Sequence, residues 1–382
     1  MMKRNFMDKL LDGVEVVWTP LGEVADYEQP TKYLVKSQNY SDDFKTPVLT
    51  AGKTFILGYT DETNGIYNAS KNPVIIFDDF TTANKWVDFD FKAKSSAMKM
   101  ITSKNESVIL LRYIYHWINM LPSGLIEGDH KRQWISNYSY KLIPIPPLNI
   151  QAEIVRILDT FTELTAELTA ELEARKKQYN YYREQLLTFE EGEVEWKPLG
   201  ETLVRTKGTK ITAGQMKELH KINAPLKIFA GGKTIAFVDF EDIPKKDINR
   251  EPSIIVKSRG NIEFEYYDKP FSHKNEMWSY HSKNKNINIK FVYYFLKINE
   301  LYFQNIGSRM QMPQIATPDT DKFKIPVPPI EEQDRIVSIL DKFDALTSSI
   351  TEGLPCEIEL RQKQYEYYRN MLLSFPKEEV EK

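Results

Sequence analysis

The sequence predicts an α+β protein in which two globular mixed α/β modules are joined by two long helices that form an antiparallel coiled coil. Its length, an internal repeat and an apolar stripe at the end of each repeat lead to this prediction. A chain of 382 residues exceeds what one hydrophobic core usually organises. Its 41% hydrophobic and 27% charged residues exclude a disordered chain, and no apolar run approaches the length of a bilayer span. We therefore expect a cytoplasmic protein with at least two domains.

An internal repeat divides the chain into two halves. Four patterns occur twice in the same order, which excludes chance, and they imply a module of residues 1–147 followed by a helix of 148–190, then a module of 191–329 followed by a helix of 330–376. The matching pairs are WTPLGE at 18–23 with WKPLGE at 196–201, PIPPL at 144–148 with PVPPI at 326–330, QAEIVRILD at 151–159 with QDRIVSILD at 333–341, and QYNYYR at 178–183 with QYEYYR at 364–369.

The two helical regions carry apolar and aromatic residues at steps of three and four. Such spacing is typical of a coiled-coil seam, and a single amphipathic rod would leave this stripe in water. Pairing the two regions within one chain buries both stripes. Gly353 and Pro355 predict a kink or a break in the second region. The predicted seam and partner-facing residues are Ile154, Ile157, Phe161, Leu164, Leu168, Tyr179, Tyr182, Ile336, Ile339, Phe343, Tyr365 and Tyr368.

Each module mixes short apolar β-like runs with one stretch of helical periodicity. We expect strands at 74–77, 253–256 and 262–266, and helices at 108–121 and 289–303. Between the repeated patterns the two modules diverge widely in sequence. They are therefore expected to share a scaffold but not a surface.

Charge is unevenly distributed, although the chain as a whole has a net charge of -3. Residues 197–330 contain 22 Lys and Arg against 14 Asp and Glu, a net charge of +8, whereas residues 1–149 contain 17 of each. The helical segments 150–196 and 331–382 have net charges of -6 and -5. The near-neutral total conceals a basic module, which indicates a polyanionic partner.

Catalytic and metal-binding patterns are not found in the sequence. The single cysteine, Cys356, excludes an intramolecular disulfide and a thiolate-rich zinc site, and the five histidines lack metal-ligand spacing. The Gly-Lys-Thr triplets at 52–54 and 232–234 lack the earlier glycine of a phosphate-binding loop. The Pro-Pro patterns lack the flanking residues of an amino-methyltransferase motif. We therefore predict no catalytic residue and no metal site.

Basic and polar residues near turns are the remaining functional signal. Such side chains can reach base edges and phosphates, although for each one an ordinary solvated loop is an equally favoured explanation. The predicted DNA-binding residues are Lys53, Lys92, Lys94, Ser95, Arg132, Gln133, Lys233, Lys257, Ser258, Arg259, Ser308, Arg309 and Gln311.

The four repeated patterns together resemble the specificity subunit of type I restriction–modification systems, over nearly the whole chain. The resemblance implies two target-recognition domains, each reading one half of a split asymmetric site in double-stranded DNA, and no catalytic activity of the chain's own. It also implies two methyltransferase subunits and, in the full complex, two restriction subunits. The resemblance further implies that S-adenosylmethionine, ATP and Mg are bound by those partners, so we expect no cofactor on this chain. The short apolar runs lead us to expect no membrane association.

Two further questions stay open in the sequence. A stand-alone coiled-coil DNA-binding or scaffold protein without a methyltransferase partner is the alternative function. The tandem TAEL units at 165–168 and 169–172 each add ~6 Å of helix, which favours a helix that acts as a ruler between the two half-sites. A helix-favouring segment of low complexity is the alternative explanation of this tandem pattern.

Overall fold

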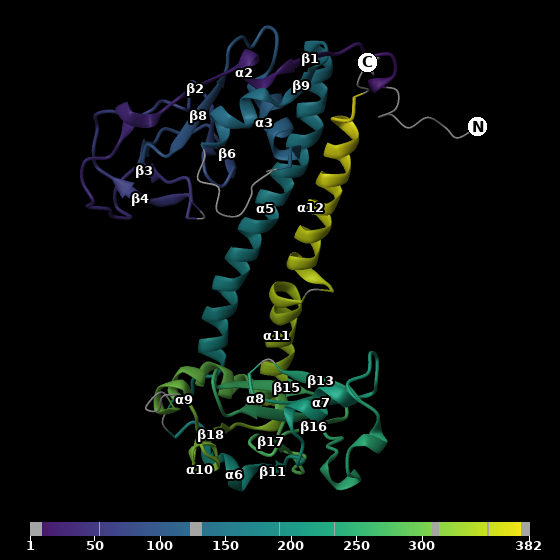
Figure 1. Cartoon of the computed structure of the whole chain (residues 1–382). Helices are drawn as coiled ribbons and strands as arrows, with labels where there is room; N and C mark the ends of the chain where they lie inside the picture. The colour runs from purple at the N-terminus through teal and green to yellow at the C-terminus, as the bar shows by residue number, and fades with distance from the viewer. Residues whose placement is uncertain are drawn as a thin grey trace. The chain divides into compact units, whose positions relative to one another are not determined.

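The computed structural model describes residues 10–52, 54–122, 132–190, 192–232, 234–307, 313–349 and 351–375. The chain divides into two compact units (Figure 1). Unit 1 comprises Met1–Leu168 and Ile358–Lys382, and unit 2 comprises Thr169–Glu357. Each unit therefore contains one module and parts of both helical regions. Across the described ranges, no helix combines the length and the apolar character needed to span a bilayer.

The module of unit 1 contains a four-stranded antiparallel sheet of order β2-β8-β5-β6, a three-stranded mixed sheet of order β4-β3-β7 and a two-stranded ladder of β1 and β9. The strands are β1 (Val17–Pro20), β2 (Ala25–Glu28), β3 (Thr46–Leu49), β4 (Ile56–Thr60), β5 (Val74–Asp78), β6 (Asn84–Val87), β7 (Lys92–Ala93), β8 (Met98–Ser103) and β9 (Leu142–Ile145), and the helices are α2 (Leu21–Val24), η1 (Pro30–Tyr33), α3 (Leu111–Met120), α4 (Gln133–Ser136) and η2 (Tyr138–Tyr140).

The module of unit 2 repeats this topology, with sheets of order β11-β17-β14-β15 and β13-β12-β16 and a ladder of β10 and β18. The strands are β10 (Glu195–Pro198), β11 (Val204–Lys207), β12 (Leu226–Phe229), β13 (Ile235–Val238), β14 (Ser253–Lys257), β15 (Glu263–Tyr267), β16 (Phe271–His273), β17 (Trp278–His281) and β18 (Lys324–Val327), and the helices are α6 (Leu199–Thr202), α7 (Ala213–Leu219), η3 (Phe240–Asp242), η4 (Lys245–Asp247), α8 (Ile289–Ile298), α9 (Glu300–Gly307) and α10 (Thr317–Asp321).

The two modules therefore share one scaffold, as the repeat predicts, although their sequences diverge. Strands β5, β14 and β15 confirm the three predicted apolar runs. Helix α3 confirms the first predicted helix, but the second is divided into α8 and α9. Asn299 lies between them with φ of -98° and ψ of 8°, outside the helical region, and its side chain donates to the backbone oxygen of Phe295. This local hydrogen bond offers the backbone an alternative to the continued helix.

The repeated sequence patterns lie where the chain enters and leaves each module. Trp18 of β1 is opposite Pro144 of β9, and Trp196 of β10 is opposite Pro326 of β18. In each unit the opening Trp-x-Pro pattern thus pairs antiparallel with the proline-rich hinge. The module is closed by its own two ends, immediately before the long helix begins.

The first helical region forms one continuous helix, α5 (Leu148–Leu186), of 39 residues. The second is divided into α11 (Ile330–Ser348) and α12 (Gly353–Leu372), which confirms the predicted break. Gly353 has φ of +74°, and a Cβ atom there would collide with the backbone oxygen of Ala345. Only glycine fits this junction without strain.

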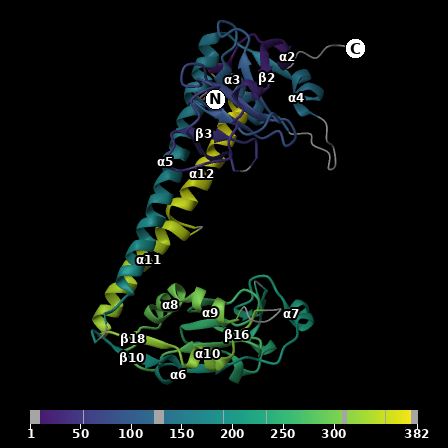
Figure 2. The same cartoon turned by 90° about the vertical axis from the view of Figure 1, so that its left-hand side faces the viewer.

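Aromatic side chains join the helices within each unit. In unit 1, α12 runs antiparallel to the first half of α5, and Tyr368 stacks on Phe161 with 5.2 Å between ring centroids (Figures 1 and 2). In unit 2, Phe343 of α11 stacks on Tyr179 at 5.7 Å and on Tyr182 at 5.9 Å. These equivalent contacts confirm the predicted pairing of the two helical regions inside each unit.

The other predicted seam residues fall into two groups. Half-buried positions include Ile157, Leu164, Leu168 and Ile339. Ile154 and Ile336 are fully buried in clusters that also contain Trp117 and Phe291 of the modules, so they anchor the helix to its module as well as facing the seam. Tyr365 likewise hydrogen-bonds Nδ1 of His116 in α3, at 3.1 Å. The sequence predicts these three residues at the seam or facing a partner, and the structure adds contacts with the modules, because the helices also pack on α3 and α8.

A buried glutamine at the start of each long helical region holds it to its module. In unit 1, the amide nitrogen of Gln151 donates to the backbone oxygens of Pro146 at 2.8 Å and Val108 at 2.9 Å, and its oxygen accepts from the backbone nitrogen of Leu110 at 2.9 Å. One side chain thus satisfies backbone groups of both the proline hinge and the segment that leads into α3. This explains why a glutamine opens the repeated helix pattern.

Gln333 occupies the equivalent place in unit 2, where it contacts Pro328, Asn286 and Asn288. Replacing it with leucine should lower the free energy of unfolding of unit 2 by about 3 kcal/mol, because buried backbone groups lose their partners. Thermal and urea denaturation would measure this loss. The Gln362→Leu variant, at an exposed position of α12, is the control and should change stability by less than about 0.5 kcal/mol. Equal stability of the two variants would contradict this role of Gln333.

Candidate nucleic-acid interface

A groove of about 1060 Å³ crosses the module of unit 2. Its walls come from β11 and the following loop, from α7, from η4 and from the turn between β16 and β17. Four basic residues line it: Arg205, Lys207, Lys210 and Lys246. The sequence-based prediction did not include any of these four.

A tight backbone contact holds the lysine-bearing loop against the sheet. A Cβ atom at Gly208 would collide with the backbone oxygens of His273 and Lys274 at the end of β16. The next residue, Thr209, is 3% exposed, and its backbone nitrogen donates to His273 at 2.8 Å. Lys207 and Lys210 flank this anchored pair and are themselves exposed. The loop is thereby fixed while its two ammonium groups remain in solvent.

Ion pairs compensate only part of the positive charge in the groove. Arg205 lies 3.5 Å from Asp321, so its charge is partly compensated. Asp242 and Asp247 also line the groove, and Asp242 is 3.4 Å from Lys221. Lys207, Lys210 and Lys246 form no ion pair within the described ranges, which leaves three ammonium groups available to a polyanion. Lysines of this kind contact phosphates rather than read bases.

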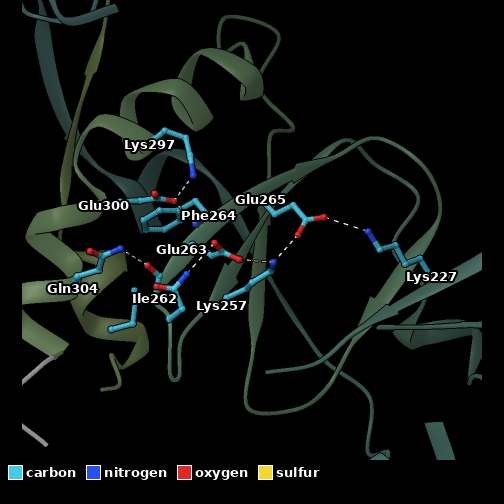
Figure 3. A network of polar contacts seen from close by, with 10 residues as sticks. Lys227, Lys257, Ile262, Glu263, Phe264, Glu265, Lys297, Glu300 and Gln304 are labelled. Carbon is cyan, nitrogen blue, oxygen red and sulfur yellow. Dashed lines mark hydrogen bonds and ion pairs between the residues drawn. The ribbon is translucent and has the colours of Figure 1, made fainter. Parts of the chain in front are cut away.

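The β14–β15 hairpin lies next to this groove. Its Lys257 donates to Glu263 Oε1 at 2.6 Å and lies 2.8 Å from Glu265 Oε2, and Lys227 of β12 lies 3.2 Å from the other oxygen of Glu265 (Figure 3). Burial opposes the charge of Lys257, but the two carboxylates outweigh it and raise the pKa of this lysine. Burial likewise opposes the charge of Glu265, and the two lysines lower the pKa of this carboxyl group. The network ties the hairpin to the neighbouring sheet.

Two of the predicted DNA-binding residues in this hairpin are buried. The side chain of Lys257 is 10% exposed, and Ser258 is 2% exposed and donates to the backbone oxygen of Glu276 at 2.7 Å. Their polar groups are satisfied inside the module, so the prediction that they touch DNA directly is corrected to a structural role. Arg259 is exposed, and the described residues provide no ion pair for it. It stays a prediction.

In unit 1 the predicted residues divide in the same way. Lys92 is 2% exposed and lies 3.1 Å from Glu62, and Gln133 is 3% exposed in α4 and accepts from Asn137 at 3.0 Å. Both face the interior, so direct DNA contact by them is withdrawn. Lys94 is half-buried, with its ammonium 5.7 Å from the Tyr40 ring centroid, whereas Ser95 and Arg132 are exposed. Lys94, Ser95 and Arg132 stay predictions. The remaining predicted residues lie outside the described ranges: Lys53, Lys233, Ser308, Arg309 and Gln311.

The groove lysines show what the sequence signal missed. The pattern Lys-Gly-Thr-Lys at 207–210 is a basic pair around a turn glycine, and this is the criterion that singled out other residues. Lys246 lies in η4, far from them in the sequence, and joins them only in the folded module. Among the described residues, no group of three His, Cys, Asp or Glu side chains is arranged to hold a metal ion.

Comparisons with known proteins agree with this architecture. The family model of the type I restriction modification DNA specificity domain matches residues 14–175 and 206–360. The chain is 52% identical to the type I restriction enzyme EcoR124I/EcoR124II specificity subunit of Escherichia coli, with 100% of this chain and 99% of that protein aligned. The crystal structure of a type I restriction–modification S subunit from M. genitalium has a TM-score of 0.69 at 17% identity, covering 98% of this chain and 99% of that one, which shows the shared fold. The chain therefore belongs to the specificity subunits of type I restriction–modification systems.

Proposed function

We propose that this chain selects the DNA sequence on which a type I restriction–modification complex acts, with each module reading one half of a split asymmetric site. One observation carries the proposal: two modules of the same topology differ widely in sequence between the repeated patterns. One scaffold used twice suits two similar docking tasks, and different side chains suit two different half-sites. The lysine groove of unit 2 supplies the phosphate contacts that such binding needs.

The helices have two roles in this proposal. Helix α5 sets the distance between the half-sites, and the acidic faces of α5, α11 and α12 dock two methyltransferase subunits, to which two restriction subunits are added in the full complex. S-adenosylmethionine, ATP and Mg are bound by those partners, and this chain contributes no catalytic group. The complex works in the cytoplasm on chromosomal DNA.

Co-expression with a candidate methyltransferase subunit tests the proposal. The two proteins should purify together, and sequencing of the host DNA should show methylated adenines in a split site. Exchanging residues 20–143 for a divergent counterpart should then alter one half-site only. Altered sequence in both halves would contradict independent reading. A chain that purifies alone and leaves host DNA unmodified would favour the alternative, a stand-alone DNA-binding or scaffold protein.

Charge removal in the groove should weaken binding without changing the site. The Lys207→Ala/Lys210→Ala variant loses two phosphate contacts, so the slope of log affinity against log salt should fall by about 2. Binding of the assembled complex to its site, measured between 50 and 200 mM salt as an approximate range, would detect this change. Lys285→Ala is the matched control, because Lys285 is exposed but does not line the groove. An unchanged salt slope in the double variant would place the groove away from DNA.

A further inference from the structure

We propose that Arg259 is a specificity-determining residue of unit 2, whose guanidinium reads a G·C base pair in the half-site of that module. The inference rests on the proposed function and adds the residue and the base. Arginine donates two parallel hydrogen bonds to the O6 and N7 atoms of guanine, which is the commonest specific contact in the major groove. Such a contact requires a guanidinium that is free to bind and a backbone that holds it in place.

The backbone around Arg259 is held from several directions. The backbone nitrogen of Gly260 donates to Pro313 at 2.9 Å, and that of Ile315 donates to Ser258 at 3.0 Å. Arg259 and Gln314 pair as an isolated β-bridge. The backbone of residues 313–315 therefore holds the loop between β14 and β15 through contacts inside the module.

The far side of the same hairpin is held by α8 and α9. Gln304 donates to the backbone oxygen of Ile262 at 3.1 Å (Figure 3). Glu300 accepts from the backbone nitrogen of Phe264 at 2.8 Å and is itself bound by Lys297 at 2.7 Å. Together with the contacts of Lys257 to the two glutamates, this fixes both strands of the hairpin. Lys257 and Ser258 are therefore positioning residues for Arg259, not contacts of their own.

The position of the loop also suits DNA. Ser258 bonds to Glu276, and the neighbours of Glu276 on both sides, Asn275 and Met277, line the lysine groove. Arg259 thus lies beside a surface that can bind phosphates. A side chain next to a surface that binds the phosphates can reach the base edges in the adjacent groove of the DNA.

The equivalent hairpin of unit 1 supports a role in discrimination. Strands β5 and β14 occupy the same place in the two topologies, and the second residue after each strand is Phe80 in unit 1 and Arg259 in unit 2. Phe80 is 43% exposed, and the hairpin is held by a buried pair of Asp79 and Lys99 at 3.5 Å. Both modules hold the hairpin rigidly with buried charges and present different exposed side chains. This is the pattern expected of two readers for two different sequences.

The test uses the assembled complex and a panel of duplexes, each with one base pair of the wild-type site changed. The wild-type complex should lose on the order of 10- to 100-fold in affinity for a changed G·C pair, and Arg259→Ala should bind all four base pairs at that position equally. Arg259→Lys keeps the charge but loses the planar fork of donors, so it should discriminate less sharply than the wild type while keeping most of the non-specific affinity. Sequencing of methylated host DNA should show the same position relaxed.

Several outcomes decide the matter. Arg259→Ala that weakens binding equally on every duplex, and so keeps full discrimination, would show a phosphate contact and overturn the inference. Lys285→Ala, an exposed control, should leave discrimination unchanged at every position. A wild-type complex that methylates no split site would refute the proposed function itself. By contrast, a wild-type complex that methylates a split site, together with Arg259 variants that recognise the same sequence, would refute only the role of Arg259.

Discussion

Removing residues 169–172 from α5 is expected to shorten the unspecified spacer of the DNA site while leaving both half-sites unchanged. Helix α5 is continuous from Leu148 to Leu186, so the loss of one TAEL unit shortens the whole helix. Four residues correspond to ~6 Å of length and roughly 1.1 turns, so the face of the helix is nearly preserved. Both modules keep their own cores, because these residues belong to neither module. Duplicating the unit should lengthen the spacer correspondingly.

Mapping of methylated adenines in host DNA would measure the spacer directly. The control is a helix of unchanged length, Thr169→Ala/Glu171→Ala, which alters the same unit at exposed positions. This control should methylate the wild-type site. A deletion variant with the wild-type spacer would show that α5 does not act as a ruler. A change inside either half-site would show instead that the deletion disturbs the modules.

Ending the chain at residue 357 should unfold the module of unit 1 while leaving unit 2 folded. The removed part of α12 and its extension contribute Leu372, Leu373 and Phe375 to the core, with Tyr365 and Tyr368 packed against it. At about 1.5 to 3 kcal/mol for each fully buried apolar side chain, their combined loss approaches 10 kcal/mol. This is comparable with the whole stability of a typical domain. The core of unit 2 contains residues 187–340 and loses nothing.

Amide hydrogen exchange of the shortened chain would show the difference, with protection lost in α3 and the β2-β8-β5-β6 sheet and retained in α8 and the β11-β17-β14-β15 sheet. The control is a full-length chain with Leu360→Ala and Tyr367→Ala, since these side chains of α12 are 58% and 65% exposed. It should keep protection in both units. Protection of α3 in the shortened chain would show that unit 1 folds without α12.

The sequence predicted the architecture well because the repeat is written in local patterns. The strands at 74–77 and 253–256, the two helical regions and the break at Gly353 all follow from composition and spacing within short windows. The pairing of Trp18 with Pro144 could not be predicted in the same way, because neither pattern indicates which distant strand it pairs with. The same applies to Gln151, whose three bonds reach residues on both sides of the hinge.

The candidate site was less accessible to sequence analysis, and the lysines show why. Lys257 and Arg259 are two positions apart and have the same charge, yet one is enclosed by two glutamates and the other is exposed. The glutamates come from the strand that follows, so burial depends on the register of β14 with β15. Lys92 is also buried and lies 3.1 Å from Glu62, which belongs to the loop after β4. Charge alone therefore does not distinguish an exposed basic residue that can contact DNA from a buried one that stabilises the fold.

The two modules are synthesised in one order, but their cores can be completed only in the opposite order. Domains usually fold during synthesis from the N-terminus onward. Here the core of the first module contains Leu372, Leu373 and Phe375, whereas the core of the second ends at Leu340. The module translated first must therefore wait for α12, and the module translated second completes its core earlier. Only a chain translated beyond Phe375 can hold both modules in their final form.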